Sequence, residues 1–162
     1  MRRAVERFLE TAVLFLVAAL AVVVVLGVGF RKLGASLVWY DEVASVLLAW
    51  LTYYGAALAA LRRAHIGVPT LLEWLPPRAR VSLVWISEAF VIGFFAVIAW
   101  AGWRVIRILA GTSLISLQWV PTQFTQSVIP VGALLFIVAR LLSFPEILER
   151  ARHARPDSAE HA

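Results

Sequence analysis

Four long runs of apolar residues with almost no charge dominate this sequence, and they decide the solvent in which it can fold. Residues 11–30, 43–61 and 120–139 carry no charge, and the run at residues 81–103 contains one ionisable side chain, Glu88. A helix needs about 20 apolar residues to cross a hydrocarbon core about 30 Å thick. Each run reaches about that length, so the sequence predicts an all-α integral membrane protein with four transmembrane helices.

The composition also favours lipid over water as the solvent. Of 162 residues, 62% are hydrophobic and 15% are charged, whereas a soluble domain is about half apolar and about a quarter charged. The runs are continuous rather than alternating, which excludes a transmembrane barrel. An open strand in lipid would leave backbone groups unpaired. We therefore expect a membrane domain at residues 1–145, with helices at about residues 8–30, 43–62, 81–104 and 120–142.

Two features separate these helices from other segments. Gly111, Thr112 and Ser113 predict a break before the fourth helix. The first apolar run is longer than the about 7–15 residues of a signal-peptide core, and three more spans follow it. The sequence therefore predicts that the first span stays attached as a helix.

The basic residues divide unequally between the two ends of the spans. Of the 15 lysines and arginines, eleven lie before the first span, between the second and third, or after the fourth. The other four are Arg31, Lys32, Arg104 and Arg107. Because basic residues concentrate on the cytoplasmic side, the sequence predicts that both termini are cytoplasmic and that residues 146–162 form a cytoplasmic tail.

The connection between the second and third spans is too apolar for a simple loop. Within residues 65–80, Val68, Leu71, Leu72 and Leu75 are spaced as i, i+3, i+4 and i+7, which is the spacing of one helical face. Arginines lie on both sides of this segment. The pattern predicts a short interfacial helix on the cytoplasmic surface of the membrane.

Several classes of function lack the residues that they need. Without cysteine there is no disulfide, thiolate metal site or cysteine nucleophile. No histidine lies within a span and the one methionine is the initiator, which excludes axial haem ligands. A single His65 near the membrane can neither form a zinc site nor serve a serine nucleophile. The arginines lie mostly at the ends of the apolar runs and do not form one basic face that could bind nucleic acid. We predict no enzyme activity, no cofactor and no nucleic-acid binding.

Two carboxylates begin the second span, directly after two aromatic residues. Asp41 and Glu42 follow Trp39 and Tyr40. A pair of carboxylates can divide acid and base work in catalysis. Acidic groups also stabilise a helix N-terminus, and aromatic rings anchor at the membrane interface. We favour this anchoring role, or contact with a partner.

Glu88 is the ionisable residue inside the third span. Such a residue suggests a proton path or an ion ligand. It lies seven residues inside the span, about 10 Å from the cytoplasmic boundary at 1.5 Å per residue. We therefore expect it to pair with an arginine, such as Arg62, Arg80 or one on a partner. A homo-oligomeric channel or proton-coupled exporter that uses Glu88 is the alternative. A membrane-embedded enzyme would need a polar cluster that this sequence lacks.

A complete secondary transporter commonly has repeated halves and helices that are broken around a polar site at mid-membrane. The one such break in these spans is Pro130, in the fourth helix. The chain is therefore predicted to be part of a larger machine.

Several motifs occur in an order that resembles a known family. They are Trp39-Tyr40-Asp41-Glu42 before the second span, Arg62-Arg63-Ala64-His65-Ile66-Gly67-Val68 after it, and Val120-Pro121 and Ile129-Pro130-Val131-Gly132 in the fourth. Over about residues 8–145 the chain is similar to the small membrane subunit of tripartite ATP-independent periplasmic (TRAP) transporters, the DctQ-like family. It departs from that family at Pro69, where an acidic residue is frequent.

The resemblance implies a noncatalytic scaffold subunit, encoded as a separate polypeptide, in a bacterial inner membrane. In that family a large membrane subunit holds the substrate and sodium sites and performs an elevator movement. A periplasmic solute-binding protein delivers an organic acid, and the small subunit braces the large one in the lipid. Candidate contacts with the partner or with lipid are Trp39, Asp41, Glu42, Arg63, His65, Glu88, Pro121 and Pro130.

Overall fold

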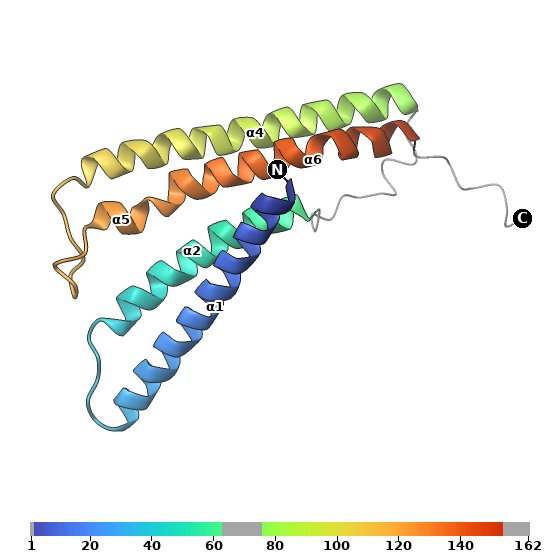
Figure 1. Ribbon diagram of the computed structural model, residues 1–162. Coiled ribbons are helices and arrows are strands. Elements are labelled where there is room, and N and C mark those ends of the chain that lie inside the picture. The colour runs from blue at the N-terminus through green and yellow to red at the C-terminus, as the bar shows by residue number, and fades with distance from the viewer. Residues whose placement is uncertain (1, 63–75, 154–162) are drawn as a thin grey trace, which may run out of the picture.

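The computed structural model describes residues 2–62 and 76–153, and the regular elements in these ranges are helices (Figure 1). They are α1 (Arg2–Lys32), α2 (Tyr40–Leu61), α4 (Pro77–Ile108), α5 (Thr122–Gln126) and α6 (Val128–His153). Four segments of the described chain are long and apolar enough to cross a membrane, and α5 and α6 together form the fourth. The predicted all-α class with four spans is confirmed. The segment predicted as an interfacial helix lies for the most part in residues 63–75, outside the described residues, and α4 already begins at Pro77.

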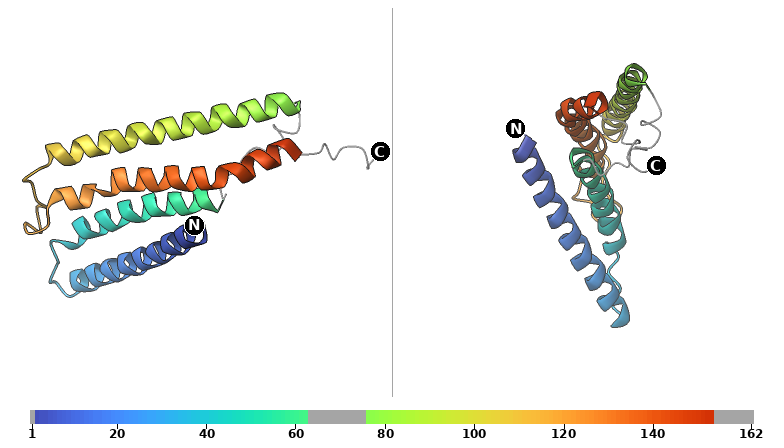
Figure 2. Two further views of the ribbon diagram at one scale, coloured as in Figure 1. Left: turned by 45° about the horizontal axis from the view of Figure 1, so that its top comes forward. Right: turned by 90° about the vertical axis from the view of Figure 1, so that its right-hand side faces the viewer.

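The helices lie in the spatial order α4, α6, α2, α1, and each packs on the next (Figure 2). The two inner helices, α6 and α2, therefore come from opposite halves of the chain. The start of α1, the end of α2, the start of α4 and the end of α6 share one end of the molecule, which we call the Arg2 end (Figure 1). The connections at residues 33–39 and 109–121 share the other, which we call the loop end.

A Schellman motif ends α1. The Gly34 N–H donates to the Arg31 carbonyl at 3.2 Å, and the Ala35 N–H donates to the Phe30 carbonyl at 3.0 Å. Gly34 has φ +76°, a left-handed conformation that costs glycine little and other residues more. The chain therefore stops being helical at Lys32 and turns toward α2.

Two glycines allow α6 to approach its neighbours α2 and α4 closely. A Cβ atom at Gly132 of α6 would lie 2.6 Å from the Cβ of Tyr53 in α2. A Cβ atom at Gly102 of α4 would lie 2.8 Å from Ile129 Cγ2 and 2.9 Å from Pro130 Cδ in α6. Small residues at helix contacts are the usual means by which helices associate in lipid.

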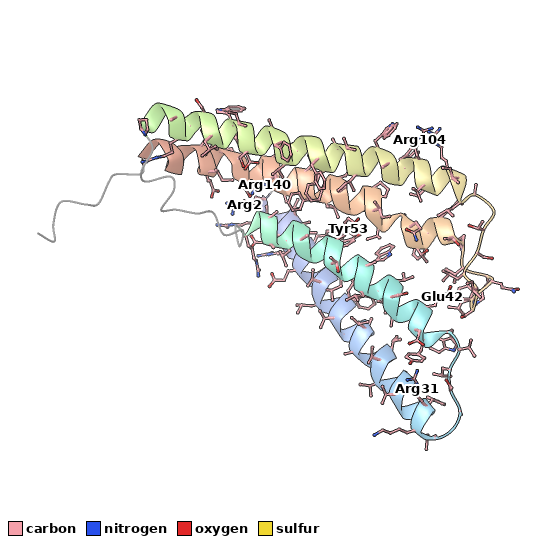
Figure 3. The ribbon with its side chains drawn as sticks, turned by 180° about the vertical axis from the view of Figure 1, so that it is seen from behind. Arg2, Arg31, Glu42, Tyr53, Arg104 and Arg140 are labelled. Carbon is pink, nitrogen blue, oxygen red and sulfur yellow. The ribbon has the colours of Figure 1, made fainter. Side chains whose placement is uncertain are left out.

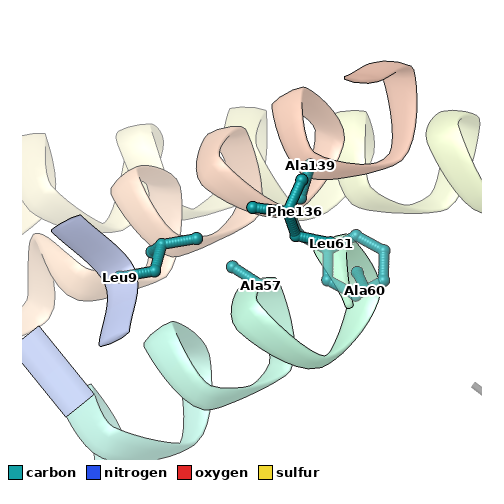
Figure 4. Packing of buried hydrophobic residues seen from close by; sticks show 6 residues of the cluster. All are labelled: Leu9, Ala57, Ala60, Leu61, Phe136 and Ala139. Carbon is teal, nitrogen blue, oxygen red and sulfur yellow. The ribbon is translucent and has the colours of Figure 1, made fainter. Parts of the chain in front are cut away.

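One buried apolar cluster joins α1, α2 and α6 near the Arg2 end (Figure 4). Its members are Leu9, Ala57, Ala60, Leu61, Phe136 and Ala139. Phe136 also stacks on Phe95 of α4, with ring centroids 3.8 Å apart and planes 11° from parallel. This cluster thus connects all four spans.

The fourth span differs in two details from the single helix predicted at residues 120–142. It is interrupted at Ser127, which separates α5 from α6 and lies three residues before Pro130, the break that the sequence indicated. It also continues through Pro145 to His153, so residues 146–153 prolong α6. A proline inside a membrane helix is tolerated where neighbouring groups satisfy the freed backbone.

Candidate functional site

A buried ion pair joins α4 to α6 within the apolar part of the molecule. Glu88 is 4% exposed, and both of its carboxylate oxygens accept hydrogen bonds from Arg140. The Arg140 Nε–H donates to Oε2 at 3.1 Å, and a terminal guanidinium N–H donates to Oε1. This two-pronged contact is the strongest way in which an arginine binds a carboxylate. The charge of Glu88 is therefore neutralised within the chain.

Arg140 is not among the partners that the sequence suggested for Glu88. Arg62 instead binds Glu6 and Glu10 of α1, each at 3.0 Å. Hydrogen bonds to Glu6 and Glu10 raise the pKa of the Arg62 guanidinium. Arg140 was missed because the apolar pattern does not reveal that α6 is the neighbour of α4. A usable signal was its depth, since Glu88 and Arg140 lie near the same ends of their spans.

Further polar contacts hold the helices together at the Arg2 end (Figure 3). Arg2 forms an ion pair with Glu146 of α6 and donates to the Leu61 carbonyl at 3.3 Å. The Ser143 hydroxyl donates to the same carbonyl at 3.3 Å. The last carbonyls of a helix have no partner within it. Side chains from α1 and α6 therefore cap α2, which ties three helices together at one point.

Trp50 of α2 binds the break between α5 and α6. Its indole N–H donates to the Thr125 carbonyl at 3.2 Å, and its ring stacks on Tyr54 with centroids 6.0 Å apart. The ring of Phe124 lies against the same indole, with centroids 5.5 Å apart. An interrupted helix frees carbonyl groups, which are costly in lipid unless they find a donor. Trp50 supplies that donor.

Glu42 binds the connection between α4 and α5. Its Oε1 accepts the Ile115 N–H at 3.0 Å, and its Oε2 accepts the Ser116 N–H at 2.8 Å. The Ser116 hydroxyl donates to the Val38 carbonyl at 3.3 Å. Glu42 lies in the first turn of α2, as expected. Its bonds to a loop more than 70 residues away were not predicted.

The candidate residues from the sequence fall into separate places. Trp39 is the N-cap of α2 and Pro121 the N-cap of α5, so both lie at the loop end together with Asp41. Pro130 lies in the first turn of α6, where its missing N–H needs no helical partner. Arg63 and His65 lie outside the described residues. The structure therefore brings the candidates at the loop end together and keeps Glu88 apart from them.

The outer helices present large apolar side chains that the rest of the described residues does not cover. Phe15 of α1 and Phe90 of α4 are exposed, as are Phe94 and Trp100 of α4. Of the 18 consecutive residues that form the most apolar stretch of α4, 6% are buried. Across residues 2–62 and 76–153, no group of three His, Asp or Glu side chains could hold a metal ion. The polar contacts described above hold helices together.

Two comparisons relate the sequence of this chain to known proteins. Residues 20–150 match the family described as tripartite ATP-independent periplasmic transporters, DctQ component. The chain is also 27% identical over 142 residues to the sialic acid TRAP transporter small permease protein SiaQ of Vibrio cholerae serotype O1, strain ATCC 39315 / El Tor Inaba N16961. That alignment covers 87% of this chain and 82% of the relative.

Proposed function

The chain belongs to the DctQ component family of the tripartite ATP-independent periplasmic transporters, and from this premise we propose that it is the scaffold subunit of a sodium-coupled importer of organic acids. Membership makes the chain a transport component rather than an enzyme, and a multi-pass protein of the bacterial inner membrane. In the proposed complex it braces a large elevator-type membrane subunit, which works with a periplasmic solute-binding protein. Both termini of the chain face the cytoplasm.

The internal pairing of Glu88 is the observation that carries this proposal. A transport site must offer polar groups to its solute or ion. Both oxygens of Glu88 are instead used by Arg140, and the pair is buried between α4 and α6. The charges of Glu88 and Arg140 therefore hold two helices of the described chain together. This arrangement suits a subunit that supports transport by another protein.

The uncovered helix faces support an obligate partner. The cluster around Phe136 joins the four spans at the Arg2 end, but most of the apolar surface of α4 and α1 lies outside it. Lipid covers part of such a surface, and a large membrane subunit would cover the rest. The proposed substrate class rests on the relative named for sialic acid, which is an organic acid.

Copurification tests the scaffold role. The tagged full chain is purified from native membranes in mild detergent, and the proteins recovered with it are identified by mass spectrometry. We expect stoichiometric recovery of one large polytopic membrane protein. An unrelated tagged four-span protein from the same membranes is the control. Recovery of this chain alone, as a defined homo-oligomer, would sink the proposal and support the channel or exporter.

The alternative, a channel or proton-coupled exporter, depends on titration of Glu88. Protein abundance, and transport divided by that abundance, are measured in cells with Glu88→Gln and with the double variant Glu88→Gln/Arg140→Gln. A structural pair predicts that transport is largely kept and that the double variant restores any lost abundance. A proton carrier predicts that both variants lose coupling, because neither has a titratable carboxyl group at residue 88.

A further inference from the structure

The most exposed large apolar side chains of the described residues lie in the connections, not on the helices. Ile115 is 91% exposed, and Leu33, Val38 and Trp119 are each 81% exposed. All four belong to the two connections at the loop end. Large apolar side chains that are this exposed, on two connections at the same end, indicate a place that water does not cover in the working protein.

Both connections are also uncharged. Residues 33–39 and 109–121 contain no Asp, Glu, Lys or Arg. The nearest cations in sequence, Lys32 and Arg107, lie on the helices that lead into them. A loop that projects into water is usually polar, so this pattern favours an environment less polar than water.

The connection between α4 and α5 is folded, and much of its backbone is satisfied. The Leu114 N–H donates to the Val120 carbonyl at 3.1 Å, and the Val120 N–H donates to the Leu117 carbonyl at 2.9 Å. Glu42 accepts the N–H groups of Ile115 and Ser116. Backbone groups that leave water need such partners. This loop can therefore enter a less polar layer without a large desolvation cost.

The loop lies next to exposed aromatic residues near the end of α4. The Gln123 amide donates to the Ile106 carbonyl at 3.2 Å, so the loop closes beside the last turn of α4. One turn earlier, the Arg104 guanidinium lies 5.1 Å from the ring centroid of Trp100. Trp100 and the neighbouring Trp103 are exposed. Exposed tryptophans with an arginine folded over them are typical of the membrane–water interface.

We propose that residues 109–121 form an anchor loop, in which Ile115 and Trp119 insert into the interfacial layer of the bilayer and Glu42 holds the loop in that position. The occupant of this surface is phospholipid, because the loop directly follows the end of α4 that carries the exposed Trp100 and Trp103 and Arg104, which are residues typical of the membrane–water interface. Glu42 is accordingly a positioning residue, and the anchor does not depend on the scaffold role.

The absence of cysteine allows a direct measurement of depth. Single cysteines at Ile115 and Trp119 carry a nitroxide label in the full chain, which is reconstituted in nanodiscs of phosphatidylethanolamine and phosphatidylglycerol. Relaxation by oxygen and by a water-soluble nickel chelate is measured for each site. Ala162→Cys, in the polar segment at the C-terminus, is the aqueous reference, and Phe94→Cys is the hydrocarbon reference. We expect both loop sites to lie between these references in depth.

Nickel accessibility at Ile115 and Trp119 equal to that at Ala162 would overturn the proposal. Protection that arises only after a large membrane subunit is added would also overturn it, because protein would then be the occupant. The role of Glu42 is tested with Glu42→Leu in the Ile115→Cys background. We expect the label to move toward water, and Asp41→Leu, an exposed neighbouring acid, to leave it in place. An unchanged depth with Glu42→Leu would refute the positioning role.

Discussion

At the scale of single residues, the environment of a charge decides its contribution to stability. Arg140 and Arg62 both bind carboxylates between helices, but the Arg140 side chain is 13% exposed and that of Arg62 is 46% exposed. A pair that is shielded from water cannot lose one partner without leaving a buried charge. An exposed pair is solvated in either case.

This difference predicts distinct losses for two matched substitutions. Arg140→Met should lower the free energy of unfolding by about 3–5 kcal/mol, because Glu88 is left buried and unpaired. Arg62→Met should cost less than about 1 kcal/mol. Glu88→Leu combined with Arg140→Met should recover most of the loss. Unfolding by SDS titration in mixed micelles measures all three values. Equal losses for the two single variants, or a double variant that loses at least as much stability as Arg140→Met, would contradict the assignment.

The pairing of Glu88 was predicted from the sequence, but its partner was not. An ionisable group within an apolar span requires compensation, whatever the fold. The identity of the compensating residue depends on which helices are neighbours, and uniformly apolar helices carry little information on that point. The bonds of Glu42 escaped prediction for a similar reason, since they join a helix start to a distant loop.

At the scale of elements, the solvent explains why the number of spans was predictable. Lipid requires each crossing to be an unbroken run of about 20 apolar residues, and four such runs are visible without any knowledge of packing. Gly111, with φ +86°, follows the end of α4 within the predicted break. Pro130 predicted a break in the fourth span, and the interruption lies three residues earlier, at Ser127. The hydrogen bond that the break receives from Trp50 was not predicted, because it comes from another helix.

The α5–α6 break therefore depends on a donor that lies outside it. Trp50→Phe keeps an aromatic ring against Tyr54 and Phe124 but leaves the Thr125 carbonyl without the indole N–H. We expect a loss of about 1–3 kcal/mol and faster hydrogen exchange that is confined to residues 122–131.

The matched control is Trp85→Phe, at a half-exposed ring that packs on Phe144 with centroids 4.7 Å apart. It should leave exchange at residues 122–131 unchanged. If Trp50→Phe gives the same exchange rates as the unmodified chain, the hydrogen bond does not stabilise the break.

At the scale of the whole molecule, the even number of spans brings the start of α1 and the end of α6 to the same end. The excess of basic residues at that end predicts that it faces the cytoplasm. Single cysteines at Ser36 and Ala162 of the chain can test this orientation with a membrane-impermeant maleimide. The cysteine at Ser36 should react in intact spheroplasts, and that at Ala162 should react only after lysis. The reverse pattern would show the opposite orientation.

The order α4, α6, α2, α1 has a consequence for how the protein is made. Ribosomes deliver α1, α2 and α4 before α6, yet α6 lies between α2 and α4. The first three helices therefore enter the bilayer without the neighbour that connects them. They remain as an α1–α2 hairpin and a separate α4 helix until α6 is inserted. The helix bundle is then completed only when synthesis of α6 is complete. In a chain that ends before α6, the α1–α2 hairpin and α4 lack the helix that packs between them, and such a chain would be a substrate for proteolytic quality control.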